Sequence, residues 1–207
     1  MKVDRDDRLA ALTHRRTYFD DVYRNDHDPW AFETSWYERR KRDITMAVLP
    51  NPRYRRGVEP GCSIGTLTER LAERVDELIA FDFVTEAVQA ARRRIDRADV
   101  TIVEAVFPVY WPAGTGDLVV WSEVAYYLTD SGFDLAMNGL ERWLEPGGHL
   151  VAVHYTGVTD YPRTGRQVAT RIEQHPALQR LTAFTDPDFE LAVWERRVER
   201  GRPSVGR

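Results

Sequence analysis

A short loop between two apolar runs constrains the fold of this chain more than any other feature. Residues 58–65 read Val-Glu-Pro-Gly-Cys-Ser-Ile-Gly, so a strand predicted over 57–59 enters a tight turn before a helix that begins near Thr66. A second strand, predicted over 78–83, carries Asp82, which lies 21 residues after Gly61. This spacing predicts the opening β-α-β unit of a nucleotide-binding fold, in which the acid grips the hydroxyls of a ribose.

The side chains of the loop indicate which nucleotide fits. A dinucleotide pyrophosphate needs glycine at places that Ser63 and Thr66 occupy here, and both side chains would crowd it. Glu59 at the strand end suits a cationic ligand better than two phosphates. The loop therefore favours S-adenosylmethionine, which carries a sulfonium and an ammonium and no phosphate, over a nicotinamide cofactor. An ordinary turn whose glycines serve only geometry stays an open alternative.

Composition fits a single globular domain. The chain has 207 residues, of which 43% are hydrophobic, and a net charge of -4 with its basic residues spread along it, so we expect no nucleic-acid partner. Cys62 is the one cysteine, which excludes an internal disulfide, and the five histidines lack metal-ligand spacing, so we expect no metal. Residues 1–16 lack a secretory pattern and no apolar run reaches membrane-spanning length, so we expect a cytoplasmic protein without a membrane partner.

Two predicted helices precede the first strand. A stripe of Leu9, Leu12, Arg16, Phe19 and Tyr23 indicates the first helix, and the second is predicted over 35–49, with residues 36, 40, 44 and 48 close to one face. We therefore divide the single domain into a helical N-terminal cap over 1–52, an α/β core over 53–197 and a mobile tail over 198–207.

Strands and helices alternate through the core. After the first two strands, further strands are predicted over 100–106, 117–122 and 149–154, and helices near 66–75, 84–95, 133–144 and 165–174. The strands are near-continuous apolar runs, as expected when helices cover both faces of a sheet, so the pattern predicts an α/β fold with a doubly wound, mostly parallel sheet. Two later runs, 181–185 and 189–196, predict a hairpin at the sheet edge.

Residues 18–197 resemble the class I S-adenosylmethionine-dependent methyltransferases, and more closely the NodS-like family of nodulation methyltransferases. The resemblance rests on residues 28–30 with 35–38, on 59–65, on 121–128, and on the generic Leu-Glu-Pro-Gly-Gly of 144–148. It implies a Rossmann-like, seven-stranded sheet with an antiparallel final strand, and N-methylation of a free amine on an amino sugar of an oligosaccharide. The chain departs from the common class I pattern at Ser63, where glycine is usual, and offers Glu104 where an aspartate is usual.

Strand ends and the resemblance together predict the residues that hold S-adenosylmethionine and, after transfer, S-adenosylhomocysteine. Glu59 should accept from the cofactor ammonium, Asp82 from the ribose, and Arg40 on the cap helix should meet the carboxylate; for Trp36 and Arg40 a core and a surface role stay open. The predicted cofactor-binding residues are Trp36, Tyr37, Arg40, Glu59, Gly61, Cys62, Ser63, Gly65, Asp82, Phe83, Val84, Glu104, Ala105, Val106, Ser122 and Glu123.

Acceptor residues are predicted after strands 117–122 and 149–154, because ligands of open α/β sheets lie at the carboxyl ends of strands. Glu123 is the leading candidate to contact or deprotonate an amine, with Tyr126 and His154 as further catalytic candidates, against structural roles for all three. The predicted substrate-binding residues are Trp30, Tyr126, Tyr127, Tyr155 and Tyr161. Cys62 is expected to fill the loop and not to act as a nucleophile.

Three other functions stay open beside a small-molecule N-methyltransferase. An O-methyltransferase acting on a small hydroxylated acceptor uses the same residues, since amine chemistry comes from the resemblance alone. A non-catalytic module that binds S-adenosylmethionine is disfavoured by the acidic and aromatic side chains after residue 122, and a nicotinamide reductase by Ser63 and Glu59.

Overall fold

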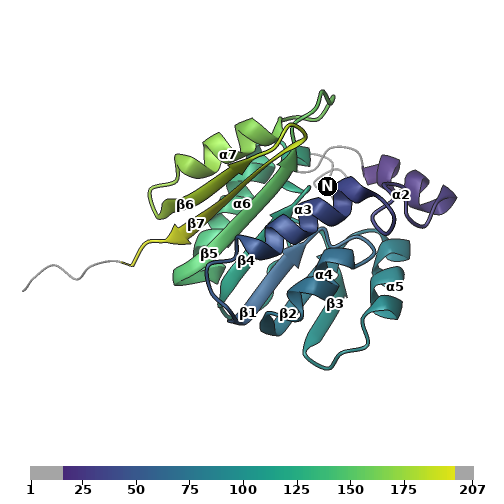
Figure 1. Cartoon of the computed structure of the whole chain (residues 1–207), viewed down its shortest axis with the longest axis horizontal. Coiled ribbons are helices and arrows are strands. Elements are labelled where there is room, and N and C mark those ends of the chain that lie inside the picture. The colour runs from purple at the N-terminus through teal and green to yellow at the C-terminus, as the bar shows by residue number, and fades with distance from the viewer. Residues whose placement is uncertain (1–15, 199–207) are drawn as a thin grey trace, which may run out of the picture.

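Seven strands form one sheet in the order β3-β2-β1-β4-β5-β7-β6 in the computed structural model, which describes residues 16–198 (Figure 1). Only β7 runs antiparallel to its neighbours in this sheet of described strands. The predicted doubly wound, mostly parallel sheet is therefore confirmed, and β7 inserts between β5 and the edge strand β6. The strands are β1 (Tyr54–Pro60), β2 (Val75–Asp82), β3 (Val100–Glu104), β4 (Gly116–Ser122), β5 (Leu144–Tyr155), β6 (Leu178–Thr185) and β7 (Phe189–Arg196).

Polar side chains fix where several helices begin. The hydroxyls of Ser35, Thr129 and Thr164 accept from backbone amides of the first turns of α3, α6 and α7, and Thr164 forms a reciprocal capping box with Gln167. The helices are α2 (Arg16–Asn25), α3 (Trp36–Ala47), α4 (Thr66–Leu71), α5 (Thr85–Arg94), the 3-10 helix η1 (Ala125–Tyr127), α6 (Asp130–Trp143) and α7 (Gly165–Glu173).

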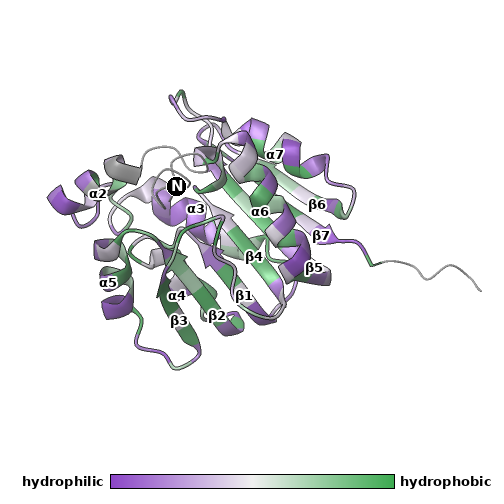
Figure 2. Cartoon of the chain, turned by 180° about the vertical axis from the view of Figure 1, so that it is seen from behind, coloured by the Kyte–Doolittle hydropathy of each residue, from purple (hydrophilic) through white to green (hydrophobic). Residues whose placement is uncertain are grey.

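The apolar core lies on both faces of the sheet. Alternate residues of β4 serve the two sides: Leu118 and Val120 pack with side chains of α3 and α4, while Val119 and Trp121 pack with those of α6 and α7. Figure 2 shows the central strands as apolar and the outer surfaces of the helices as largely polar. This two-sided burial explains the continuous apolar runs of the strands.

The order of the strands places a ligand crevice. The chain runs from β1 outward to β2 and β3, and then returns to β4 on the other side of β1. Such a reversal leaves a gap at the carboxyl ends of β1 and β4, where ligands of doubly wound folds bind. Helix α2, which comes before β1, lies at this end of the sheet, and α3 crosses one face of the sheet (Figure 1).

Some predictions concern residues outside the described range. Leu9 and Leu12 of the first helical stripe lie there, as does the tail predicted over 198–207 apart from Val198. Within 16–198, no helix has the length and apolar character that crossing a membrane requires. The same described residues contain no cluster of three or more histidine, cysteine or acidic side chains suited to a metal ion.

Candidate functional site

A cavity of about 410 Å³ opens at the carboxyl ends of the strands, between the sheet and helices α2 and α3. Its size is within the usual range for small-ligand sites. The predicted site residues that line it are Trp30, Tyr37, Glu59, Gly61, Cys62, Ser63, Asp82, Phe83, Ala105, Ser122, Glu123, Tyr126, Tyr127, Tyr155 and Tyr161. The predicted residues that do not line it are Trp36, Arg40, Gly65, Val84, Glu104, Val106 and His154.

The loop after β1 holds its shape through backbone geometry. Gly61 has φ +71°, and a Cβ there would lie 3.0 Å from the side chain of Val124. Ser63 has φ +52°, a conformation that usually favours glycine. Its hydroxyl lies 2.5 Å from the hydroxyl of Tyr23 on α2, so the serine ties the loop to the helices that precede β1. This contact accounts for a serine where related loops carry glycine.

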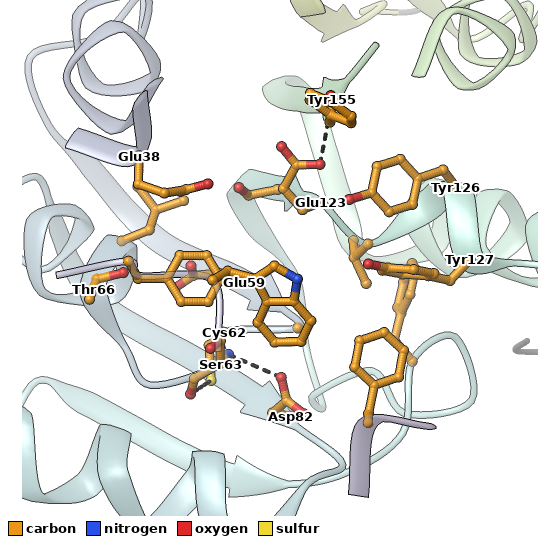
Figure 3. A pocket seen from close by; sticks show the side chains of 18 of the residues that line it. Glu38, Glu59, Cys62, Ser63, Thr66, Asp82, Glu123, Tyr126, Tyr127 and Tyr155 are labelled. Atoms are coloured by element: carbon orange, nitrogen blue, oxygen red, sulfur yellow. Dashed lines mark hydrogen bonds between the residues drawn. The ribbon is translucent and has the colours of Figure 1, made fainter. Parts of the chain in front are cut away.

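Asp82 at the end of β2 braces the same loop. Its Oδ2 accepts from the backbone N–H of Ser63 and its Oδ1 from that of Val84, both at 3.0 Å (Figure 3). Burial raises the pKa of Asp82, and the backbone donors oppose that rise. A carboxylate oxygen can accept more than one hydrogen bond, so Asp82 keeps capacity for the two hydroxyls of a ribose.

Glu59 at the end of β1 is buried and incompletely paired. It is 2% exposed, and its Oε2 has no hydrogen-bond partner among the described residues. Burial raises the pKa of Glu59 to about 8; the neighbouring hydroxyl of Thr68 opposes the rise, and the charge of Asp82 adds to it. A buried acid without a partner destabilises the fold, so a cationic ligand at this position would remove an existing cost.

Cys62 packs between the loop and the core and is 4% exposed. Burial raises the pKa of its thiol well above the ordinary value, so the reactive thiolate is disfavoured. This environment agrees with the prediction that Cys62 fills the loop.

Helix α3 turns a polar face to the cavity. Glu38, Lys41, Arg42 and Thr45 line it, whereas Trp36 is 69% exposed on the opposite side. Trp36 and Arg40 were predicted to contact the cofactor on the strength of the resemblance, and neither lines the cavity. The face of α3 that lines it carries charged side chains.

Arg40 lies outside the cavity. Its Nη1 pairs with Oδ2 of Asp186 at 2.5 Å, and its guanidinium lies 5.8 Å from the ring centre of Phe189. It therefore connects α3 to the β6–β7 hairpin, and the described structure does not bring it to a cofactor carboxylate. Arg42, two residues later, lines the cavity instead. Its Nη1 is buried, lies 3.9 Å from Oε2 of Glu38, and makes no hydrogen bond among the described residues.

A buried ion cluster joins α3 to the end of β4. The Nζ of Lys41 lies 2.7 Å from Oε1 of Glu123 and 2.9 Å from Oε1 of Glu38, and the lysine is 3% exposed. Oε2 of Glu123 accepts from the backbone N–H of Tyr155 at 3.0 Å. Figure 3 shows Glu38 and Tyr126 pointing toward Glu123 from opposite sides.

Lys41 decides the ionisation of Glu123. Burial alone would raise the pKa of Glu123, but the positive charge of Lys41, together with hydrogen bonds from Lys41 and Tyr126, outweighs it, so the pKa lies below its ordinary value. Glu123 is thus an ionised acceptor at neutral pH. An acid with a depressed pKa is a weak general base, so of the two roles predicted for Glu123, contact with an amine is favoured over deprotonation.

Tyrosine rings form the wall beside Glu123. The ring of Tyr161 lies 4.9 Å from that of Tyr126 and 4.6 Å from that of Tyr127, and Tyr127 meets Phe19 of α2 at 4.9 Å. Trp30 packs against Phe19 and continues this aromatic surface toward the loop. The wall offers faces for stacking against a sugar or a cation.

His154 does not line the cavity. It is 2% exposed, and its Nε2 accepts from the backbone N–H of Ala125 at 3.1 Å. Burial lowers the pKa of His154 to about 4, so the ring is neutral and its acceptor nitrogen is in use. The prediction that it faces the crevice as a catalytic group does not match this geometry, because the alternation along β5 turns His154 away and Tyr155 toward the cavity.

The other predicted site residues that do not line the cavity pack in the core or lie at the surface. Gly65 precedes α4 at φ +82° and packs against Ala91. Val84 is buried against Phe19 and Tyr23, and Glu104 is exposed at the end of β3. The cofactor contacts of these residues and of Val106 stay predictions.

Several residues of the cavity were not predicted from the sequence. One of them, Lys41, could have been noticed because lysine is rare in this chain: of the 29 lysine and arginine residues, only Lys2 and Lys41 are lysines. The aromatic residues Phe19, Tyr23 and Phe32 lie before the first strand, where no motif marks them. The cavity-lining residues that the prediction omitted are Phe19, Tyr23, Phe32, Glu38, Lys41, Arg42, Thr45, Thr66, Leu67, Phe107, Val124, Leu128 and Thr159.

Comparison with known proteins gives a family match. Residues 20–153, more than half of the chain, match the family described as Nodulation protein S (NodS). A nodulation protein S of Rhizobium tropici is 34% identical over 127 residues, which are 60% of this chain and 53% of that protein. The chain spans about half the length of the curated relatives it matches.

Solved structures share the fold. A Pseudomonas syringae protein assigned as a methyltransferase is 39% identical with a TM-score of 0.70, and the match covers 78% of this chain and 100% of that one. The N-methyltransferase NodS of Bradyrhizobium japonicum, solved with S-adenosyl-L-homocysteine, has a TM-score of 0.77 at 24% identity, covering 87% and 97% of the two chains. The sheet is therefore that of the class I methyltransferases.

Proposed function

The chain belongs to the nodulation protein S family, and on that premise we propose that it transfers a methyl group from S-adenosylmethionine to the amine of a small acceptor such as an amino sugar. A NodS structure that is 25% identical to this chain is of an N-methyltransferase, which favours nitrogen as the accepting atom. The residues of the cavity support the proposal independently of family membership.

The observation that carries the proposal is a pair of buried, incompletely paired polar atoms of opposite character in one cavity. The hydroxyl of Thr68 is the neighbour of Glu59, and Nη1 of Arg42 lies 3.9 Å from Oε2 of Glu38. Oε2 of Glu59 and Nη1 of Arg42 are both buried, both belong to cavity-lining residues, and both lack a hydrogen-bond partner among the described residues. A buried acceptor and a buried donor suit the ammonium and the carboxylate of an amino acid. S-adenosylmethionine carries both groups together with a ribose, for which Asp82 is available.

The bound cofactor would supply a methyl group on a positively charged sulfur. The chain's own residues would bind and orient the cofactor. Glu59 and Arg42 would hold its amino-acid end, Asp82 would hold its ribose, and Gly61 would let the backbone approach it closely. The aromatic wall and Glu123 would face the acceptor. Positive charge moves from sulfur to nitrogen during the transfer, so an anionic and π-rich environment lowers the barrier.

Isothermal titration calorimetry tests the cofactor half of this proposal. We expect S-adenosylmethionine to bind and NADH not to bind. Arg42→Met should weaken S-adenosylmethionine by about tenfold, the size expected for one charge-assisted hydrogen bond. Arg40→Met is the matched control on the same helix and should leave the affinity unchanged, because Arg40 pairs with Asp186 outside the cavity.

The acceptor half needs a separate assay. Radiolabelled methyl transfer is measured onto amino sugars with a free amine and onto their N-acetylated forms. Labelling of the free amines alone supports N-methylation. Equal labelling of both forms would show a hydroxyl acceptor, and cofactor binding without labelling of any acceptor would point to a binding module.

A further inference from the structure

The cluster of Glu38, Lys41 and Glu123 has a role that neither the loop nor the family match assigns. We infer that Lys41 is a positioning residue that fixes Glu123 against the tyrosine wall as a permanent anion, so that Glu123 stabilises charge on an acceptor amine and never takes its proton. This inference rests on the proposed function and specifies how its acceptor site distinguishes nitrogen from oxygen.

Lys41 is fully engaged, and so its role is to hold other groups. Its ammonium has three donors, two of which meet Glu123 and Glu38, and the ring centre of Tyr37 lies 4.8 Å away. A compact ammonium fits between two carboxylates where a planar guanidinium would not. Every other lysine or arginine among the described residues is an arginine, so Lys41 is the exception in this chain.

Glu123 is held at three of its acceptor positions. Lys41 occupies Oε1, the N–H of Tyr155 occupies Oε2, and the hydroxyl of Tyr126 also donates to the carboxylate. A carboxylate has about four such positions, so one is left for a ligand. The backbone of Glu123 has φ +54°, a conformation that residues other than glycine rarely adopt.

The charged surroundings of Glu123 come from three elements. The balance favours its ionised form, because Lys41 and its hydrogen bonds outweigh burial and the neighbouring acid. The titratable groups that face it are Tyr37, Glu38 and Lys41 on α3, Tyr126 and Tyr127 on η1, and His154 and Tyr155 at the end of β5.

The transfer step then needs no base in the protein. An acceptor ammonium first loses a proton to water, and the lone pair of the neutral amine forms the new C–N bond as the C–S bond breaks. The electron pair of the broken bond stays on sulfur, and nitrogen becomes positively charged while it keeps its remaining protons. Glu123 accepts a hydrogen bond from that nitrogen as the charge grows. A hydroxyl acceptor must lose its proton during attack, and an acid fixed as an anion with a low pKa serves it poorly.

Carbon-13 NMR titration of the glutamate carboxylates tests the first half without any ligand. The Glu123 signal, assigned by its absence in Glu123→Gln, should titrate below about 4.3, the ordinary value for a glutamate, in the wild-type protein. In Lys41→Met it should move upward by about one unit or more, since the cation is gone and burial remains. Arg40→Met is the matched loss of charge one residue earlier, and it should leave the signal in place.

Methyl transfer tests the second half. Deprotonation of the acceptor amine and of Glu59 sets the main acid limb of the kcat/KM profile, so the test is a second bend at lower pH, where Glu123 takes up a proton. This lower bend should shift upward in Lys41→Met and stay in place in Arg40→Met. If Lys41→Met does not fold, Lys41→Met/Glu38→Gln, which removes one of the two acids left without a cation, takes its place.

An upward shift of the Glu123 signal together with the matching shift in the kcat/KM profile supports the inference. A wild-type Glu123 that titrates near neutrality, an unmoved signal in a folded variant, or equal rates on hydroxyl and amine acceptors would overturn it. Failure of the proposed function looks different, since S-adenosylmethionine would then either not bind to the wild-type protein or bind without methylating any acceptor.

Discussion

Two sides of one cavity are built by different means. The loop side (Glu59, Gly61, Cys62, Ser63 and Asp82) is held by backbone geometry: two positive φ angles and two amide donors to Asp82. The cap side (Glu38, Lys41, Arg42 and Thr45) presents side chains from the polar face of one helix. The loop side contains a buried acid, Glu59, and the cap side a guanidinium, Arg42, each with one buried atom that makes no hydrogen bond among the described residues. A ligand with both charges would complete both sides at once.

The largest expected effect concerns the cap side. Lys41→Met should lower the free energy of unfolding by about 3 kcal/mol or more at neutral pH, because it leaves two buried carboxylates without their cation. Urea denaturation followed by circular dichroism measures the change. Lys41→Met/Glu123→Gln should recover part of the loss, since one of the stranded charges is then absent. Equal stability of wild type and Lys41→Met would mean that the ion cluster does not hold α3 to the sheet.

The loop side should respond in affinity. Asp82→Ala should weaken S-adenosylmethionine about 10-fold to 100-fold, because it removes charge-assisted hydrogen bonds to ribose and the brace on Ser63. Calorimetry gives the change, and Asp96→Ala, an exposed acid after α5, is the control. Unchanged affinity in Asp82→Ala would separate the ribose from the end of β2.

The loop side of the cavity was easier to predict from the sequence than the cap side, because the two sides are built by different means. Gly61, Ser63 and Asp82 were predicted because a turn that needs positive φ and an acid at a fixed interval leave a local pattern. The order and direction of the strands were predictable because burial on both faces gives continuous apolar runs. Lys41 and Arg42 were missed because helical periodicity assigns apolar residues to the inside, and α3 faces the cavity with charged ones. The Lys41–Glu123 pair joins residues 82 positions apart, a contact that only the folded chain reveals.

A smaller expected effect concerns Glu59 and is a pH dependence of the affinity for S-adenosylmethionine. Because the pKa of Glu59 is raised to about 8, binding a cation should expel its proton. Affinity for S-adenosylmethionine should therefore rise as pH increases between about pH 6 and about pH 7.5, by nearly tenfold per unit at most. The sign is fixed by the raised pKa: the free protein holds the proton, the complex does not, and a higher pH favours release.

Calorimetry in buffers of different ionisation enthalpy would count the proton that Glu59 releases. Glu59→Gln should bind more weakly and lose the pH dependence over that range. A wild-type affinity that is flat with pH would place the ammonium elsewhere in the cavity.

The smallest expected effect belongs to Trp36, on the outer face of the same helix. At 69% exposure it contacts little, so Trp36→Ala should change the free energy of unfolding by less than about 0.5 kcal/mol and leave the affinity for S-adenosylmethionine unchanged. Thermal denaturation and calorimetry check both values beside Arg42→Met, which alters the inner face. A loss of affinity in Trp36→Ala without a loss of stability would show that α3 turns on binding and brings its outer face to the ligand. The cap side would then be a moving wall, in contrast to the loop side, whose backbone already has the shape that the ligand needs.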